Sequence, residues 1–247
     1  MKESTMVARR TVIALSAAAG VTSTAQAQQA APAPAPDAPR PGYLFVMGTS
    51  TNPEKIAAYA RTLAPIYEKF QGYYIASGGV GRGVTVLEGT YPHTSLLIAK
   101  FPAVDGPNAF WWSPEYRAAV ELRQGAGTFN VLKLKGSPGD VGKPEGRPAY
   151  LISIAEIKYP EKLKPYVEVA RPLLNTYGGR FISGGGRKDI ELLEGEFGNK
   201  TVNVVQFPSL EALRKFYNDP GYQKVIPVRQ SAGDYIVLEA DSPAPRT

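Results

Sequence analysis

The sequence predicts an α+β fold in which two copies of one strand-helix-strand-strand-helix-strand unit pack sheet against sheet. Three observations support this prediction. Residues 42–135 align with residues 149–240 along most of their length. Each copy alternates β-rich apolar segments with segments whose apolar residues recur at three- and four-residue steps. The predicted strands are apolar on both faces, so one copy alone would leave an apolar sheet face in water, which soluble proteins avoid.

The repeat is clearest near the end of each copy. Residues 108–124 read NAFWWSPEYRAAVELRQ, and residues 214–230 read RKFYNDPGYQKVIPVRQ. Ser113-Pro114 and Asp219-Pro220 are typical of an N-cap residue followed by a first-turn proline, so each copy is predicted to start a short helix there. A Leu-Glu-Gly triplet also occurs in both copies, and one residue of slippage in a glycine-rich stretch brings the rest into register.

The elements follow in the same order in each copy, and the second copy shows them best. Residues 150–157 are predicted to form a strand, and Pro160 is predicted to open a helix that ends at Gly178-Gly179. Glycines then interrupt a bent strand, which the sequence predicts between Arg180 and Glu194. A strand, two helices and a closing strand complete the copy. Pro65 and Pro172 lie at equivalent places inside the first helices and predict a kink in each.

Right-handed crossovers put both helices of such a unit on one face of its sheet, which is the ferredoxin-like arrangement. Each copy is then predicted to cover the open sheet face of the other. The result is an intrachain pseudo-dimeric α+β barrel. The predicted segments are a signal peptide, an Ala/Pro-rich linker, the first repeat, a second linker, the second repeat and a tail, at residues 1–27, 28–41, 42–135, 136–148, 149–240 and 241–247.

The N-terminus has the three parts of an export signal. Arg9 and Arg10 precede a short apolar stretch at residues 11–21, and Ala25-Gln26-Ala27 supplies the small residues that a signal peptidase accepts. We therefore expect a periplasmic or secreted protein, exported by the Sec or twin-arginine route, without stable membrane insertion after cleavage.

Composition excludes several classes of site. The chain has no cysteine and a single histidine, His93, so thiolate chemistry and a multi-histidine metal site within one chain are excluded. Removing Lys2, Arg9, Arg10 and Glu3 from the net charge of +6 leaves +4, and basic residues alternate with acidic ones. This pattern does not predict nucleic-acid binding. We predict no metal and no cofactor.

Both repeats resemble the domain of unknown function 1330 family, within the dimeric α+β barrel superfamily. The resemblance rests on YGGRFISGGG, LEG, FPS, FYNDPGYQ and Arg229 in the second copy, and on LEG, FP, FWWSPEY and Arg123 in the first. It implies the barrel fold but no particular reaction, because the superfamily includes cofactor-free monooxygenases, lactone isomerases and haem enzymes. Ser77 and Gly184 stand where this family usually has arginine, and Tyr73 stands where the second copy keeps Arg180.

Haem relatives use a histidine ligand, but His93 lies in a predicted turn and the second copy has Asn199 there, so we do not predict haem binding. Glu88 and Glu194 could act as general bases or could simply end their strands in hydrogen bonds. Arg123 and Arg229 could bind a carboxylate or pair with those glutamates. Ser153 and Asn203 could mark the polar side of a cavity between the sheets or bond to backbone.

The catalytic residue is left unknown, with Glu88, Glu194, Tyr222 and Arg229 as candidates. The residues predicted to line a ligand site are Tyr43, Tyr74, Trp111, Tyr116, Arg123, Tyr150, Ser153, Arg180, Asn203, Tyr222 and Arg229. We expect a small aromatic or carboxylated ligand between the two sheets. The alternatives are a cofactor-independent isomerase or monooxygenase, and a structural or assembly protein without a ligand. Further assembly into homo-oligomers remains open.

Overall fold

All strands of the computed structural model belong to one curled sheet, in the order β7-β9-β6-β10-β3-β2-β4-β1-β5-β8. The structure describes residues 38–140, 142–184 and 186–243. The predicted signal peptide (residues 1–27), the Ala/Pro-rich linker as far as residue 37 and the last four residues of the tail lie outside these ranges. The α+β class and the barrel arrangement predicted from the sequence are confirmed.

The elements of the first copy follow the predicted order. They are β1 (Gly42–Ser50), α1 (Pro53–Lys69), β2 (Tyr73–Val80), β3 (Gly83–Glu88), β4 (Ser95–Phe101), α2 (Gly106–Trp111), α3 (Pro114–Glu121) and β5 (Gly127–Lys135). The Ser113 hydroxyl accepts a hydrogen bond from the Tyr116 backbone N–H and caps α3, as the sequence predicts. Pro65 lies inside α1.

The second copy repeats this order with two short 3-10 turns added. Its elements are β6 (Ala149–Ile157), η1 (Pro160–Lys162), α4 (Leu163–Thr176), β7 (Arg180–Ser183), η2 (Arg187–Asp189), β8 (Ile190–Glu194), β9 (Thr201–Phe207), α5 (Leu210–Tyr217), α6 (Pro220–Gln230) and β10 (Gly233–Asp241). Asp219 caps α6 by accepting from the Gly221 backbone N–H, and Pro172 lies inside α4.

The bent strand of each copy crosses to the other copy at its glycines, which the sequence did not predict. β2 pairs with β4 of its own copy, whereas β3 pairs with β10 of the second copy. Reciprocally, β7 pairs with β9, whereas β8 pairs with β5 of the first copy. The two four-stranded sheets are therefore hydrogen-bonded into one sheet instead of only packing face to face.

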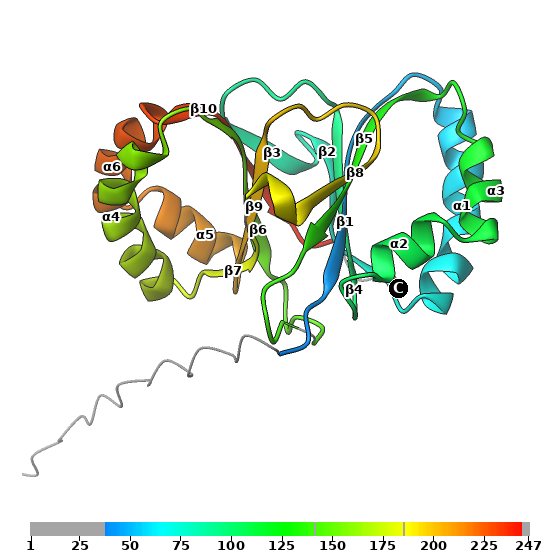
Figure 1. Ribbon diagram of the computed structural model, residues 1–247, viewed down its shortest axis with the longest axis horizontal. Helices are drawn as coiled ribbons and strands as arrows, with labels where there is room; N and C mark the ends of the chain where they lie inside the picture. The colour runs from blue at the N-terminus through cyan, green and yellow to red at the C-terminus, as the bar shows by residue number, and fades with distance from the viewer. Residues whose placement is uncertain (1–37, 141, 185, 244–247) are drawn as a thin grey trace, which may run out of the picture. The chain divides into compact units, whose positions relative to one another are not determined.

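The two faces of this sheet have different partners. The inner face packs against itself as a cluster of buried apolar side chains from both copies, among them Tyr43, Phe45, Tyr150 and Ile152. Helices cover the outer face, α1–α3 over the first copy and α4–α6 over the second (Figure 1). Side chains alternate between the faces along each strand, so Leu151 and Val237 lie under the helices.

The linker between the copies is held by a buried carboxylate. Asp140 accepts hydrogen bonds from the Tyr43 hydroxyl at 2.5 Å and from Arg180 at 2.7 Å, and pairs with Lys100 at 3.0 Å. Lys100 and Asp140 are both almost fully buried, and a buried charge is stable only when it is paired. Asp140 therefore accounts for Tyr43 and Arg180, two residues that the sequence suggested for a ligand site.

Candidate functional site

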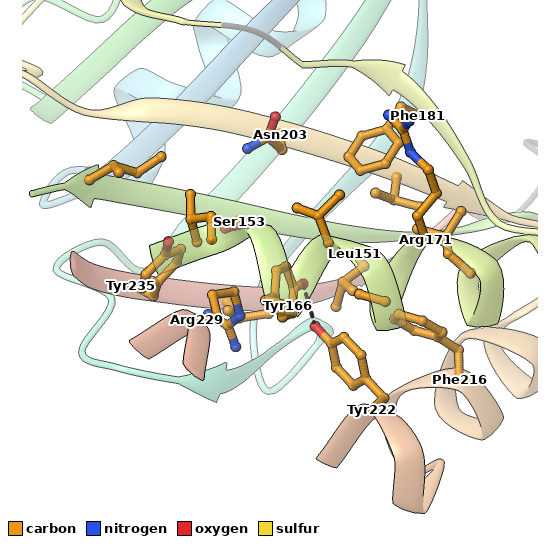
Figure 2. A pocket seen from close by; sticks show the side chains of 17 residues that line it. Leu151, Ser153, Tyr166, Arg171, Phe181, Asn203, Phe216, Tyr222, Arg229 and Tyr235 are labelled. Carbon is orange, nitrogen blue, oxygen red and sulfur yellow. Dashed lines mark hydrogen bonds between the residues drawn. The ribbon is translucent and has the colours of Figure 1, made fainter. Parts of the chain in front are cut away.

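A cavity of about 240 Å³ lies between the outer face of the second copy's sheet and helix α4 (Figure 2). Its floor comes from β6, β9 and β10, and its walls come from α4, α5, α6 and the start of β7. We call it the second-copy pocket. Its lining residues are Leu151, Ser153, Ile157, Leu163, Tyr166, Val167, Ala170, Arg171, Leu174, Phe181, Asn203, Val205, Phe216, Tyr222, Arg229, Tyr235 and Val237.

Strand register places the floor residues side by side. Ser153 is directly opposite Asn203 on β9 and opposite Val237 on β10. Side chains at directly opposed positions point to the same face of a sheet, so these three form one row across three strands. Tyr235 lies two residues before Val237 and therefore on the same face, one row away.

Helix α6 supplies the charged wall of the pocket. Tyr222 and Arg229 are seven residues apart, two helical turns, so they share one face of the helix. The Arg229 guanidinium carbon lies 4.6 Å from the ring centre of Tyr235 and 5.7 Å from that of Tyr166. The Tyr166 and Tyr222 hydroxyls are hydrogen-bonded to each other at 3.2 Å (Figure 2). Arg229 is thus held by aromatic rings and is itself almost fully buried.

The counter-ion of Arg229 comes from the first copy. Glu88, at the end of β3, accepts from Arg229 Nη2 at 2.5 Å, from the Tyr217 hydroxyl at 2.9 Å and from Gln230 Nε2 at 2.8 Å. Both oxygens are occupied, and Glu88 is not among the lining residues of the pocket. The geometry therefore makes Glu88 a positioning partner of Arg229 and gives no support for Glu88 as a general base.

The glycine of each Leu-Glu-Gly triplet allows its strand to approach the closing strand of the opposite copy closely. Gly89 has a φ of +75°, and a Cβ there would lie 2.3 Å from the Tyr235 carbonyl oxygen. Gly195 has a φ of +81°, and its Cβ would lie 2.2 Å from the Phe129 carbonyl oxygen. Only glycine combines this backbone conformation with such an approach. The triplet thus places Glu88 and Glu194 against the closing strand of the opposite copy.

Arg229 keeps donors without acceptors. Its Nε and Nη1 atoms and the Tyr235 hydroxyl are buried, and none has a hydrogen-bond partner among the described residues. A buried polar group left unpaired costs about 1–3 kcal/mol, and more when it is charged. These three groups belong to two residues that line one cavity, so an oxygen acceptor bound there would give them partners after a small shift of the two side chains.

Burial keeps Tyr222 and Tyr235 protonated. It raises the pKa of Tyr222 far above its ordinary value, and it also raises the pKa of Tyr235. An arginine side chain does not lose its proton in proteins. The second-copy pocket therefore offers hydrogen-bond donors at neutral pH, and these candidates do not act as bases there.

The first copy has an equivalent but different cavity. This first-copy pocket measures about 140 Å³ and lies between its sheet and α1. Arg123, the equivalent of Arg229, binds both oxygens of Glu194, at 2.8 and 2.5 Å. Phe129, which stacks on Arg123 at 4.4 Å, stands where the second copy has Tyr235. Neither Arg123 nor any neighbour in this pocket leaves a buried polar atom without a partner among the described residues.

The predicted site residues thus divide into three groups. Ser153, Asn203, Tyr222 and Arg229 meet in the second-copy pocket, whereas Tyr74, Tyr116 and Arg123 line the first-copy pocket. The remaining four are structural: Tyr43 and Tyr150 lie in the barrel interior, Trp111 packs under the helices of the first copy, and Arg180 pairs with Asp140.

The location expected for the ligand site, between the two sheets, needs correction. That space holds the apolar side chains of the inner faces, and the two pockets that contain Arg123 and Arg229 lie on the outer faces under the helices. The reason is the alternation along β6, which sends Tyr150 and Ile152 inward and Leu151 and Ser153 outward. The ion pairs Arg123–Glu194 and Arg229–Glu88, the alternative considered for these residues, are present.

Tyr166, Tyr235 and Phe181 were missed by the sequence reasoning although they line the second-copy pocket. Two signals could have identified them. Ser153 and Tyr235 are both strand residues that face the helices, and Tyr166 has an aromatic equivalent, Tyr59, in the first copy. A ligand site predicted between the sheets points to residues of the inner face, whereas these three residues line a pocket on the outer face.

His93 does not belong to a cluster of metal-ligating side chains in the described part of the chain. His93 Nε2 lies 3.2 Å from the Asn130 side-chain nitrogen, and burial with nearby Lys200 lowers the histidine's pKa. Across residues 38–140, 142–184 and 186–243, no three His, Cys, Asp or Glu side chains gather in a way that would hold a metal ion. None of the helices in these ranges combines the length and apolar character needed to span a bilayer.

The chain belongs to the family described as Domain of unknown function (DUF1330), whose model matches residues 41–137 and 148–240. The two matches agree with the tandem repeat seen in the sequence and in the structure.

Several solved structures are similar in fold. A protein of unknown function from Rhodopseudomonas palustris has 24% identity and a TM-score of 0.31, and the match covers 38% of this chain and 81% of that one. An anthrone oxidase-like protein has 14% identity and a TM-score of 0.48, with 84% and 93% covered. A chlorite dismutase from Candidatus Nitrospira defluvii has 10% identity and a TM-score of 0.46, with 83% and 92% covered. No curated protein matches the chain.

Proposed function

We propose that this protein binds a small organic anion, of the size of one substituted ring, in the second-copy pocket. The observation that carries the proposal is the set of buried, unpartnered donors, Arg229 Nε and Nη1 and the Tyr235 hydroxyl, on two residues that line a mainly apolar cavity. A carboxylate placed against them would supply the missing acceptors, and arginine binds carboxylates in a favourable planar geometry.

The size and walls of the pocket support a ring as the body of the ligand. An apolar cavity of about 150 Å³ is enough to hold benzene. The second-copy pocket, at about 240 Å³, has room for a ring with substituents. Tyr166, Phe181 and Phe216 offer aromatic faces against which such a ring can pack.

The exposed lining residues support access from solvent. The Val167 and Phe181 side chains are 42% and 44% exposed, although both line the pocket. A ligand can therefore enter between the outer turn of α4 and the start of β7. The predicted export signal would place this binding activity in the periplasm or outside the cell, and N-terminal sequencing of the mature protein would test that part of the proposal.

Binding is favoured over the alternative of a cofactor-independent isomerase or monooxygenase. Such an enzyme needs a group that accepts a proton from its substrate. The candidates in or beside the pocket are an arginine, tyrosines with raised pKa values and a glutamate already bound by three donors. These residues hold a negatively charged ligand well but offer no free base.

Calorimetric titration of the whole protein with benzoate and with benzylamine tests the proposal. We expect benzoate to bind and benzylamine, which has a similar size but opposite charge, not to bind. Tyr235→Phe should weaken benzoate binding about fivefold to tenfold, because it removes one hydrogen bond to a charged group. Tyr116→Phe, in the first-copy pocket, is the matched control and should leave binding unchanged.

Equal binding of both probes, or equal effects of the two tyrosine variants, would contradict the proposal. Failure of any small carboxylate to bind would leave the structural or assembly role as the better explanation.

A further inference from the structure

Ser153 and Asn203 are polar residues on the floor of the second-copy pocket that the proposed function does not use. They are directly opposite each other on β6 and β9 and lie on the pocket floor, as Figure 2 shows. Neither side chain makes a hydrogen bond to another described residue. Both are only half-buried, so they remain available to something that enters the pocket.

The first copy shows that the fold does not need polar residues at these positions. The equivalents of Ser153 and Asn203 are Val46 and Leu97, which pack in the apolar layer under α1. A strand in the middle of a sheet, covered by a helix, normally carries apolar side chains there. Polar residues at both positions in one copy, without partners, therefore need an explanation that the fold itself does not provide.

From this arrangement we infer that Ser153 and Asn203 recognise a second polar group on the bound anion. This inference rests on the proposed function, because it concerns the same pocket. A serine hydroxyl can donate and accept, and an asparagine amide offers both a donor and an acceptor. A group that can also both donate and accept fits this pair best, and a hydroxyl is the smallest such substituent on a ring. The ligand class is then a small ring carboxylate that carries a hydroxyl substituent.

The positions of the side chains fit two separate contacts on one molecule. Arg229 from α6 and Tyr235 from β10 would hold the carboxylate, and Ser153 and Asn203 lie one row further along the floor, on β6 and β9 (Figure 2). The ring would lie over the apolar side chains of the floor, such as Val237 in the same row as Ser153 and Leu151 in the next row. The specificity would come from the pair, because an apolar ligand would leave both polar side chains unpaired.

The experiment compares benzoate with 2-, 3- and 4-hydroxybenzoate by calorimetric titration of the whole protein. We expect the 3- or the 4-isomer to bind at least about fivefold more tightly than benzoate, since one added hydrogen bond in a buried site has about that effect. The 2-isomer places its hydroxyl beside the carboxylate, away from the floor, and serves as the internal control.

Two variants test the floor residues separately. Asn203→Leu introduces the residue that the first copy has at this position, and Ser153→Ala removes the hydroxyl. In Asn203→Leu and in Ser153→Ala, the affinity ratio of the favoured isomer to benzoate should fall to about one, while benzoate itself still binds. If the larger leucine side chain of Asn203→Leu blocks benzoate binding, the affinity ratio measured with Ser153→Ala is the deciding result. Leu97→Ala in the first-copy pocket is the matched control and should leave the ratio unchanged.

The outcomes separate this inference from the proposed function. If the wild-type protein binds no benzoate, the proposed function fails and the inference falls with it. If benzoate binds through Arg229 and Tyr235, but no hydroxyl isomer gains affinity or the gain survives in Ser153→Ala, only the inference is overturned.

Discussion

The two pockets of this protein occupy equivalent places in the two copies and share an Arg–Glu ion pair and a pair of hydrogen-bonded tyrosines, but they differ in the polar groups left without partners. In the first copy, Arg123 has a complete partner in Glu194, and the neighbouring Tyr59 and Tyr116 hydroxyls are hydrogen-bonded to each other. In the second copy, Arg229 shares Glu88 with two other donors and keeps two N–H groups unpaired. The lining residues of the first pocket leave no buried polar atom without a partner among the described residues, whereas those of the second leave three.

This contrast shows how a duplicated fold can separate stability from function. The arginine and glutamate that join the copies are present twice, because the crossing of the bent strands requires a buried counter-ion at each junction. Some of the polar residues around them occur in one copy only. Tyr235 and Asn203 are found only in the second copy, where Phe129 and Leu97 would have given a better-packed interior.

The largest expected difference between the pockets concerns the two arginines. Arg229→Ala should lower the free energy of unfolding by about 3 kcal/mol, because it leaves Glu88, whose side chain is only 11% exposed, as an unpaired buried charge. Arg123→Ala should cost about 1–2 kcal/mol, because the Glu194 side chain is 32% exposed and can turn to water. Urea denaturation of the two variants measures both values.

The double variant Arg229→Ala/Glu88→Gln should recover part of the loss by removing the uncompensated charge. If the two single variants lose the same stability, the contrast in burial of the two ion pairs does not govern their energetics.

Exchanging the floor residues between the pockets should have effects of opposite sign. Leu97→Asn should lower the free energy of unfolding by about 2 kcal/mol, since it places an unpaired amide in an apolar layer. Ser153→Val should raise the stability of the ligand-free protein by about 1 kcal/mol, because it removes an unpartnered hydroxyl. Melting temperatures of the unliganded variants test this, and a loss in both cases would mean that Ser153 has a structural role.

The smallest expected effect is the pH dependence of benzoate binding. Burial raises the pKa values of Tyr222 and Tyr235, so both hydroxyls lose their protons only above the ordinary value of about 10. Arg229 remains charged throughout. The affinity should therefore change less than about twofold between pH 6 and pH 9. A marked slope in this range would reveal a titrating group in the pocket and would revive the enzymatic alternative.

The sequence predicted the fold well because its signals are local and occur twice. Ser113, Asp219 and the prolines that follow them define helix starts through short-range hydrogen bonds and backbone restriction. The apolar alternation along residues 150–157 defines a strand in the same way. Because the same local signals occur in two aligned copies, each prediction is less ambiguous than it would be from one copy alone.

The candidate site was predicted only in part, because its geometry depends on contacts between the copies. Arg229, Ser153, Asn203 and Tyr222 were identified by residue type. The sheet face on which they meet was not predicted. Alternation along a strand shows which residues share a face, but it does not show which face has a cavity beside it. The pairing of Arg229 with Glu88 depends on a strand that leaves its own copy, and no local pattern specifies such a crossing.

The crossing of the bent strands also sets a limit on how this chain can be divided. A gene encoding only the second copy would produce a half-molecule with β8 projecting and no β3 beside β10. Two such halves could pair through these strand edges, and Glu194 of each half would then form the ion pair with Arg229 of the other half. The outcome would be a symmetric assembly with two equivalent pockets, whereas the fused chain can differ between its two pockets, as the residues at positions 97 and 203 do.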